Sequence, residues 1–264
     1  LSIVEKIEKT DIFQIISKNE IYRTDALVIA CGGKSIPKIG ATDFGYLVAE
    51  QFGLKIIDTR PALVPLVFSG PDLFEMKKLA GISLEARVDC DKASFDEGFL
   101  FTHRGISGPS ILQISSYWKQ GKPININLCP KLQVKEALTA MKPTLGRKKL
   151  ENVLSDLVPT RLANAILDEI GLSGNLADQS KKNLQAIEDR IQNWTLVPSG
   201  SEGYRTAEVT LGGISTEELN PKTMETKKVS GLYFIGEVVD VTGWLGGYNF
   251  QWAWSSGWVA GNEL

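Results

Sequence analysis

The chain has 264 residues, of which 43% are hydrophobic and 23% charged, a composition that excludes a fibrous or wholly disordered protein. Its 29 Lys and Arg residues against 31 Asp and Glu residues give a formal net charge of -2, so no charge excess favours nucleic acid or an anionic membrane. The apolar runs are far shorter than a membrane span and we expect no signal peptide, so we also expect a cytoplasmic protein without a membrane partner.

Cysteine and histidine usage limits the chemistry further. His103 is the only histidine, and Cys31, Cys90 and Cys129 lie far apart in the sequence. Zinc and iron–sulfur sites usually show clustered spacings, so no metal site is predicted, and a disulfide framework is equally disfavoured. The chain starts at Leu1 and enters a strand-like stretch at once, which we interpret as a fragment whose upstream part is missing.

The first part of the chain has an α/β pattern. Apolar and β-branched runs predict strands over residues 3–7, 11–17, 26–30 and 54–57. The run over 26–30 is continuously apolar, as expected of a strand buried on both faces. An apolar stripe predicts a helix over residues 43–51, capped by Thr42 or Asp43. Strand, glycine turn, helix and strand in this order are typical of an α/β domain.

From about residue 60 the pattern changes to short strands separated by Pro and Gly, which predicts a small sheet or barrel. The strands are expected over residues 64–68, 82–88, 99–101 and 124–128. Ser107 as N-cap and Pro109 in the first turn predict a helix up to Ser115. Apolar positions at three- and four-residue spacing then predict a helical bundle. Its helices are expected over residues 134–141, 148–157, 162–170 and 182–194.

The last part returns to the α/β pattern. Strands are predicted over residues 207–211 and 232–235, and a helix over 250–260, with Trp252, Trp254 and Trp258 as its core residues. The two ends of the chain therefore form one domain, residues 1–59 and 206–264, with residues 60–205 inserted between them. Within the insertion we expect a β-barrel over 60–130, a helical bundle over 131–194 and a return strand over 195–205.

Three glycine motifs are candidates for a ligand site. Two follow the buried strands, at residues 31–33 and 236–237, where glycine lets the backbone approach a ligand at the crevice of an open α/β sheet. Glu237 could accept hydrogen bonds from ligand hydroxyls, although each motif alone is better explained as a tight turn. Gly246 and Gly247 precede a helix whose free N–H groups and dipole suit an anion or the N1–C2=O edge of a flavin. The alternative is that these two glycines only shape a loop.

Residues 102–109 are a second candidate region, because His103 and Arg104 adjoin a predicted helix start. They could supply a proton donor and an anion clamp, with a structural histidine as the alternative. Arg205 could lie over the site or simply be a surface residue, and the basic run 147–149 is interpreted as a solvated helix start. No G-x-G-x-x-G, P-loop, H-E-x-x-H or G-x-S-x-G motif occurs, so a hydrolase or kinase is unsupported.

Five motifs, in order along nearly the whole chain, resemble those of a bacterial family. They are DALVIACGGKSIP at residues 25–37, TH-x-G-x-SGP at 102–109, AEVTLGG at 207–213, GLYFIGE at 231–237 and GGYNFQ at 246–251. The family is the BaiN-type NAD(P)/FAD-dependent oxidoreductases, some of which are known as aminoacetone oxidases. The resemblance implies an incomplete FAD-binding α/β domain of the glutathione-reductase type, interrupted by an inserted β-barrel and helical bundle.

The resemblance also implies roles for individual residues. The expected FAD-binding residues are Cys31, Gly32, Gly33, Gly236, Glu237, Gly246, Gly247, Tyr248, Asn249 and Gln251. His103 and Tyr248 are the catalytic candidates, and Arg104, Ser107 and Arg205 would line the substrate pocket, with the insertion over the flavin. The chain departs from the family at the missing G-x-G-x-x-G turn and its following acidic residue. It also departs at Cys31, Arg104 and Leu245, where threonine, an aromatic and a small polar residue are common.

The function predicted from this resemblance is an FAD-dependent oxidoreductase. Hydride would pass between the flavin and a small organic substrate, with NAD(P)H as the second substrate. An unsaturated carbonyl compound, a small amine or another organic molecule are open alternatives. A non-catalytic flavin-binding or redox-sensing module is the rival class. An RNA-modifying role is also open, but the lack of a basic patch favours a partner set without nucleic acid.

Overall fold

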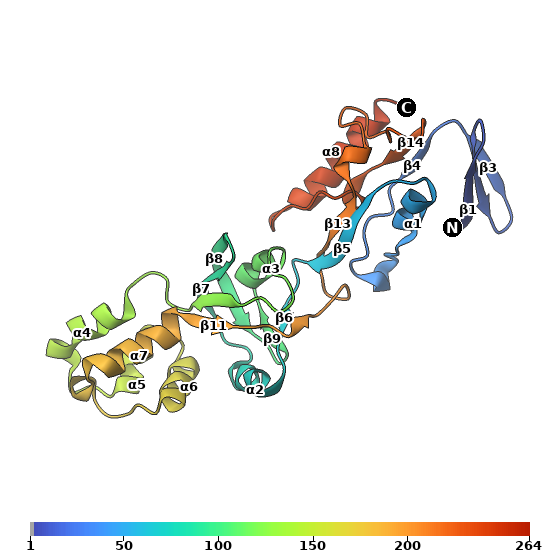
Figure 1. Ribbon diagram of the computed structural model, residues 1–264. Coiled ribbons are helices and arrows are strands. Elements are labelled where there is room, and N and C mark those ends of the chain that lie inside the picture. Colours follow the sequence, from blue (N-terminus) through green and yellow to red (C-terminus); the bar gives the residue numbers. More distant parts are fainter. Residues whose placement is uncertain (1–2) are drawn as a thin grey trace. The chain divides into compact units, whose positions relative to one another are not determined.

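The computed structural model describes residues 3–264, which divide into two compact units (Figure 1). The first unit comprises residues 3–62 and Gly203–Leu264, and the second Leu63–Glu202. Both mix helices and strands, so the chain is an α/β protein. Across residues 3–264, no helix has both the length and the apolar character that crossing a membrane requires.

Among residues 3–62 and 203–264, the strands of the first unit form three small sheets. An antiparallel sheet contains β1 (Val4–Lys9), β2 (Phe13–Ser17) and β3 (Ile21–Thr24). The other two are the parallel pair β4 (Leu27–Ile29) with β14 (Leu232–Phe234) and the antiparallel pair β5 (Ile56–Ala62) with β13 (Val209–Ile214). The helices are α1 (Phe44–Gln51), α8 (Tyr248–Gly261) and the 3-10 turns η1 (Pro37–Ile39), η3 (Thr216–Glu218) and η4 (Gly236–Val238).

The core of the first unit forms where α1 approaches the parallel pair. A Cβ at Gly45 of α1 would lie 2.7 Å from Cys31 Sγ and 2.7 Å from Val238 Cγ2, so only glycine permits this close packing. Ile29 and Phe234, from the two parallel strands, are buried in the same core. The unit is thereby held together across segments that are about 200 residues apart in the sequence.

A seven-stranded sheet and a helical bundle form the second unit. The sheet has the order β11-β10-β7-β8-β9-β6-β12, and all its neighbouring strands are antiparallel. Its strands are β6 (Leu66–Val67), β7 (Ser83–Cys90), β8 (Ala93–Phe101), β9 (Gly105–Ser107), β10 (Ile124–Asn127), β11 (Trp194–Leu196) and β12 (Gly200–Ser201). Because the end strands β11 and β12 do not pair within the described residues, the sheet is open, and the predicted closed barrel is wrong.

Helices α2 (Gly70–Leu79) and α3 (Pro109–Ser115) contact strands β8 and β9 of this sheet. The bundle contains α4 (Val134–Leu145), α5 (Leu150–Leu154), α6 (Thr160–Ile170), α7 (Lys181–Gln192) and the 3-10 turn η2 (Leu176–Asp178). Two hydrogen bonds join the start of α4 to the end of α7. Val134 N donates to Gln192 Oε1 at 3.0 Å, and Lys135 N donates to Glu188 Oε2 at 2.8 Å. These bonds satisfy helix N–H groups that have no partner within their own helix.

Several local predictions differ from the structure. The N-cap of α3 is Gly108 rather than Ser107. Gly212 lies inside β13 at a register shift between Leu211 and Gly213, so these glycines form a β-bulge rather than the strand end. Trp254 and Trp258 are exposed rather than core residues, because they lie on the opposite side of α8 from the buried Ser256 and Ala260.

Candidate functional site

The two predicted strand-end glycine motifs lie side by side in the first unit. β4 and β14 are parallel, with Ile29 opposite Phe234, so their carboxyl ends meet at one edge (Figure 1). Ile235 N donates to Ile29 O at 3.1 Å and extends this pairing by one residue. The segments that follow, residues 31–33 and 236–237, therefore start from the same edge. This edge is where open α/β sheets bind ligands.

Thr210 of β13 connects these segments, although the residue pattern alone gave it no role. Its side chain is buried, and its Oγ1 accepts a hydrogen bond from Lys34 N at 2.8 Å. Thr210 Oγ1 also lies 3.1 Å from Ser35 Oγ, and Thr210 N donates to Glu237 Oε1 at 2.5 Å. The motif AEVTLGG could have indicated this role of Thr210, since a threonine in a buried strand needs hydrogen-bond partners.

The space around the Cβ position is open at Gly32 and filled at Gly33. A Cβ at Gly33 would lie 2.5 Å from Thr210 Oγ1 and 2.7 Å from Glu237 Oε1, so this glycine permits internal packing. Gly32 has φ +71°, and no atom lies within 4 Å of the position its Cβ would take. Gly32 therefore offers open space for the close approach of a ligand to the backbone.

The polar groups around this edge are partly buried, and burial changes their acidity. Burial raises the pKa of Glu237, although its hydrogen bonds with Thr210 act in the opposite direction. Burial and the nearby Glu237 charge raise the pKa of Tyr46. The Tyr46 hydroxyl is buried with no hydrogen-bond partner among the residues described, which is unusual for a buried polar atom. Lys34 Nζ lies 5.2 Å from the centre of the Tyr46 ring.

The third glycine motif precedes α8, and α8 is hydrogen-bonded to the turn after β14. Trp252 Nε1 donates to Gly236 O at 3.0 Å, and Gly236 N donates to Ser256 Oγ at 2.9 Å. Because both bonds come from one face of α8, they fix this helix against the turn after β14. These bonds place the middle of α8 against the turn after β14, whereas the closeness of Gly246 and Gly247 to residues 31–33 stays a prediction.

The loop before α8 is shaped by Asn249. Its Oδ1 accepts a hydrogen bond from Gly243 N at 2.8 Å, and its Nδ2 donates to Gly243 O at 3.1 Å. Gly246 and Gly247 have φ +111° and +91°, conformations that favour glycine, and no atom lies within 4 Å of a Cβ position at Gly247. The start of α8 thus combines free helix N–H groups, a positive dipole end and open space.

The remaining predicted residues of this unit lie at the surface. Tyr248 is 61% exposed at the first position of α8, and Gln251 is exposed with its Nε2 donating to Ser255 Oγ at 2.9 Å. Cys31 follows β4, with its Sγ turned towards Gly45. Arg205 is exposed beside Tyr204, whose carbonyl oxygen accepts from Ile36 N at 2.8 Å.

The residues present fit the dinucleotide that such a fold implies. Gly32 and Gly247 leave space for close backbone contact, and the start of α8 suits a negatively charged or carbonyl group. The buried Tyr46 hydroxyl is a further polar atom without a partner in the described residues. The set contains no replacement for a pyrophosphate-binding G-x-G-x-x-G turn.

His103, Arg104 and Ser107 belong to the second unit. His103 and Arg104 are exposed in the turn between β8 and β9, where Thr102 Oγ1 accepts from Arg104 N at 3.3 Å and from Gly105 N at 3.1 Å. Ser107 is half-buried at the end of β9. The proximity of these residues to the glycine motifs stays a prediction.

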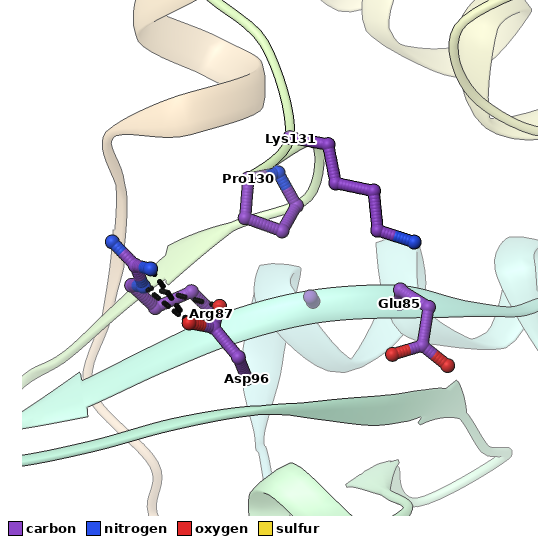
Figure 2. Close-up of a pocket in the computed structure, with 6 residues that line it drawn as sticks. Glu85, Arg87, Asp96, Pro130 and Lys131 are labelled. Atoms are coloured by element: carbon purple, nitrogen blue, oxygen red, sulfur yellow. Dashed lines mark hydrogen bonds and ion pairs between the residues drawn. The ribbon is translucent and has the colours of Figure 1, made fainter.

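A surface pocket of about 280 Å³ also lies in the second unit, and Figure 2 shows its charged lining. Arg87 Nη2 lies 2.6 Å from Asp96 Oδ2, and this carboxylate raises the pKa of Arg87. Glu85, Pro130 and Lys131 complete the part that Figure 2 labels. None of the candidate residues lines this pocket, and exposed ion pairs of this type are common on protein surfaces.

Comparison with known proteins identifies relatives of the whole chain. The family model described as HI0933-like protein Rossmann domain matches residues 2–263. The chain is 48% identical over 246 residues to the ribosomal RNA dihydrouridine synthase of Escherichia coli (strain K12), covering 91% of this chain and 60% of that protein. It is 44% identical over 266 residues to the ribosomal RNA dihydrouridine synthase of Haemophilus influenzae, covering 98% and 65%.

A third relative is more distant. The chain is 30% identical over 267 residues to the 3-dehydro-bile acid delta(4,6)-reductase of Clostridium scindens, a match that covers 94% of this chain and 64% of that protein. The chain thus spans less than two thirds of the length of these relatives. The predicted Rossmann-like family is confirmed at this coarse level by the family model, and one relative of the chain is named as a reductase.

The comparison also corrects one expectation. The prediction of a partner set without nucleic acid is wrong, because two relatives with 48% and 44% identity are named for ribosomal RNA. The prediction rested on a net charge of -2, which is an average over the whole surface. A balanced total charge leaves room for local surfaces that contact RNA.

Proposed function

The chain belongs to the HI0933-like Rossmann-domain family, and from this membership we propose that its parent protein is an FAD-dependent enzyme that reduces uridine in ribosomal RNA to dihydrouridine. One observation carries the choice of substrate. The two relatives named for this reaction are 48% and 44% identical to the chain and cover 91% and 98% of it. The bile acid reductase is a relative at only 30% identity.

The two named reactions both reduce a carbon–carbon double bond that is conjugated with a carbonyl group. Dihydrouridine differs from uridine by two hydrogen atoms across the C5–C6 double bond, which is conjugated with the C4 carbonyl. The delta(4,6) double bonds of a 3-oxo steroid are conjugated with a carbonyl in the same way. In both substrates a hydride adds to a carbon β or δ to the carbonyl, and a proton completes the reduction. This chemistry agrees with an unsaturated carbonyl compound among the predicted substrate classes.

The residues of this chain would hold and tune the cofactor. Gly32 and Gly247 would let the backbone contact FAD closely, and the start of α8 would stabilise negative charge at the flavin N1–C2=O edge. Asn249 would keep the loop before α8 in place through its two hydrogen bonds with Gly243. When bound and first reduced by NAD(P)H, the proposed electron source, FAD would supply the hydride. Tyr248 and His103 remain the candidate proton donors.

The test uses the intact gene product and unmodified ribosomal RNA transcribed in vitro. We expect bound flavin, NAD(P)H oxidation that depends on the RNA, and dihydrouridine among the digested nucleosides by mass spectrometry. Reduction of a simple enone without any dihydrouridine would refute the RNA substrate and leave an oxidoreductase. Flavin binding without turnover of either substrate would support a redox-sensing module instead.

A matched pair of variants tests the assignment of the α8 loop to the cofactor. Gly247→Val should abolish flavin retention, because a side chain there fills the open space before α8. Gly171→Val is the control, since Gly171 also has positive φ (+67°) and no atom within 4 Å of its Cβ position, but follows α6 in the bundle. Equal flavin content in the two folded variants would contradict the assignment.

A further inference from the structure

Cationic side chains gather at one end of the helical bundle. Helices α4 and α7 pack against each other in opposite directions, so the end of α4 lies beside the start of α7 (Figure 1). Ala177 N donates to Gly146 O at 2.9 Å, and Lys142 Nζ donates to Gln179 O, which holds residues 142–149 against residues 174–182. The cations of these two segments, which we call the basic tip, are Lys142, Arg147, Lys148, Lys149, Lys181 and Lys182.

The charge of the basic tip is opposite to that of the rest of the chain. Three carboxylates adjoin the six cations, those of Glu151, Asp156 and Asp178. The region therefore carries a net charge of +3, whereas the whole chain carries -2, so the remaining residues carry -5. The balanced total conceals a positive surface, because the run at residues 147–149 is joined only in the folded chain by two lysines from the start of α7.

The cations of the basic tip differ in whether the protein itself gives them a partner. Lys148 Nζ lies 2.8 Å from Asp156 Oδ2, and Lys149 Nζ lies 3.4 Å from Glu151 Oε1. Three other side chains are exposed and form no ion pair within residues 3–264, namely Arg147, Lys181 and Lys182. These three charges are available to an external anion.

The positions of Lys181 and Lys182 do not serve the stability of the bundle. They are the first two residues of α7, and its first turn contains no acidic residue. The helix dipole favours carboxylates at this end and disfavours cations. Arg147 adds a further positive charge on the adjoining segment. An anionic partner would relieve this repulsion, because the side chains and the helix end would attract it together.

The composition of the basic tip indicates which part of a partner it contacts. Residues 142–149 and 174–182 include no Phe, Tyr or Trp, so they offer no ring on which bases could stack. The same lack disfavours a membrane partner, since helices that enter a lipid surface usually carry such side chains. Lys and Arg contacts to phosphate groups position a nucleic acid without reading its sequence.

We propose that the basic tip binds the phosphate backbone of ribosomal RNA through Arg147, Lys181 and Lys182. The inference rests on the ribosomal RNA substrate proposed above and adds to it a contact surface in the bundle. It also revises the interpretation of residues 147–149 as a solvated helix start.

The salt dependence of RNA binding measures these contacts. The variant Arg147→Gln/Lys181→Gln/Lys182→Gln is compared with wild type in the intact gene product, by fluorescence anisotropy with unmodified ribosomal RNA transcribed in vitro. Each phosphate contact contributes about 0.7–0.9 to the slope of log affinity against log salt, so loss of three contacts should reduce the slope by about 2–3. The affinity at about 0.1 M salt should fall roughly tenfold or more.

A control variant removes the same charge from scattered positions. Lys18→Gln/Lys92→Gln/Lys222→Gln neutralises three exposed lysines that lie outside the basic tip. Its slope should stay within about one unit of wild type and its affinity within about threefold. Equal losses in the two variants would show that only the total charge matters and would overturn the proposal.

The single variant Lys181→Glu separates RNA binding from a structural role. A carboxylate at this end of α7 suits the helix dipole, so the melting temperature should match or exceed that of wild type. RNA affinity should nevertheless fall, because a negative charge replaces a phosphate contact. A lower melting temperature together with weaker binding would assign Lys181 a structural role and contradict the proposal.

Turnover distinguishes a failure of this proposal from a failure of the proposed function. Where wild type forms dihydrouridine, the triple variant of the basic tip should raise the KM for RNA and leave kcat and flavin content unchanged. An unchanged KM would overturn the proposal and leave the RNA substrate in place. Where wild type forms no dihydrouridine, the proposed function fails and the binding series alone decides. Binding of wild type to phosphatidylserine vesicles but not to RNA would assign the basic tip to a membrane and overturn the proposal.

Discussion

Replacing Gly33 with alanine is expected to destabilise the first unit much more than replacing Gly32. The usual backbone argument predicts the reverse order, because Gly32 has φ +71° and alanine there costs about 1–2 kcal/mol. At Gly33, however, the new methyl group would lie 2.5 Å from Thr210 Oγ1 and 2.7 Å from Glu237 Oε1. Both atoms belong to the hydrogen-bonded cluster that connects β13 with the strand-end turns.

The magnitude follows from two contributions. Overpacking a tight site costs about 1–3 kcal/mol. Moving the Glu237 carboxylate away from Thr210 N, its donor at 2.5 Å, costs about 1.5–3 kcal/mol more, since hydrogen bonds to charged groups are the stronger kind. The total of roughly 2.5–6 kcal/mol corresponds to a melting temperature lowered by roughly 5–24 °C, at about 2–4 °C per kcal/mol in a chain of this size.

Thermal unfolding of the two variants without added cofactor measures this difference directly. Circular dichroism reports the transition, and flavin affinity in the intact product gives an independent readout. We expect Gly33→Ala to melt well below Gly32→Ala, and Gly32→Ala to lose more flavin affinity relative to its change in stability. A Gly33→Ala protein that melts at or above Gly32→Ala would refute the packing argument.

Three further predictions concern single side chains. Burial raises the pKa of Glu237 above 4.5, so the native state keeps a proton that the unfolded state releases, and stability falls as the pH rises through that window. Glu237→Gln should therefore gain stability relative to wild type as the pH rises above 4.5, the ordinary pKa of the group, and a difference in denaturant midpoint that is independent of pH would contradict this. Asn249→Ala removes both bonds to Gly243, which should weaken FAD binding measured by titration, and unchanged affinity would argue against the role of this loop. The Phe99 ring is buried, with its centroid 4.9 Å from that of Phe101. Phe99→Ala should therefore lower the free energy of unfolding, measured in urea, by about 3–5 kcal/mol. A loss below about 1 kcal/mol would show that the core repacks.

Helix α2 illustrates where local sequence signals were misread. Ser69, Gly70 and Pro71 look like loop punctuation, yet Ser69 is the N-cap of α2 and the proline lies in its first turn. Proline is favoured there because its missing N–H has no partner in the first turn in any case. The helix was therefore available from the sequence, whereas the open seven-stranded sheet was not, since pairing between strands depends on register and on distant partners.

The sequence by itself determined the local features of this protein. Continuous apolar runs indicated β4 and β14, glycines indicated the turns after them, and Gly246 and Gly247 indicated the start of α8, because each depends on a few neighbouring residues. Only the tertiary structure decided which polar atoms meet. Thr210 contacts Lys34 across 176 positions and Glu237 across 27, and no periodicity in the chain encodes such partners. It also showed that Trp254 is exposed, since the burial of an apolar helix face depends on what packs against it and not on its own composition.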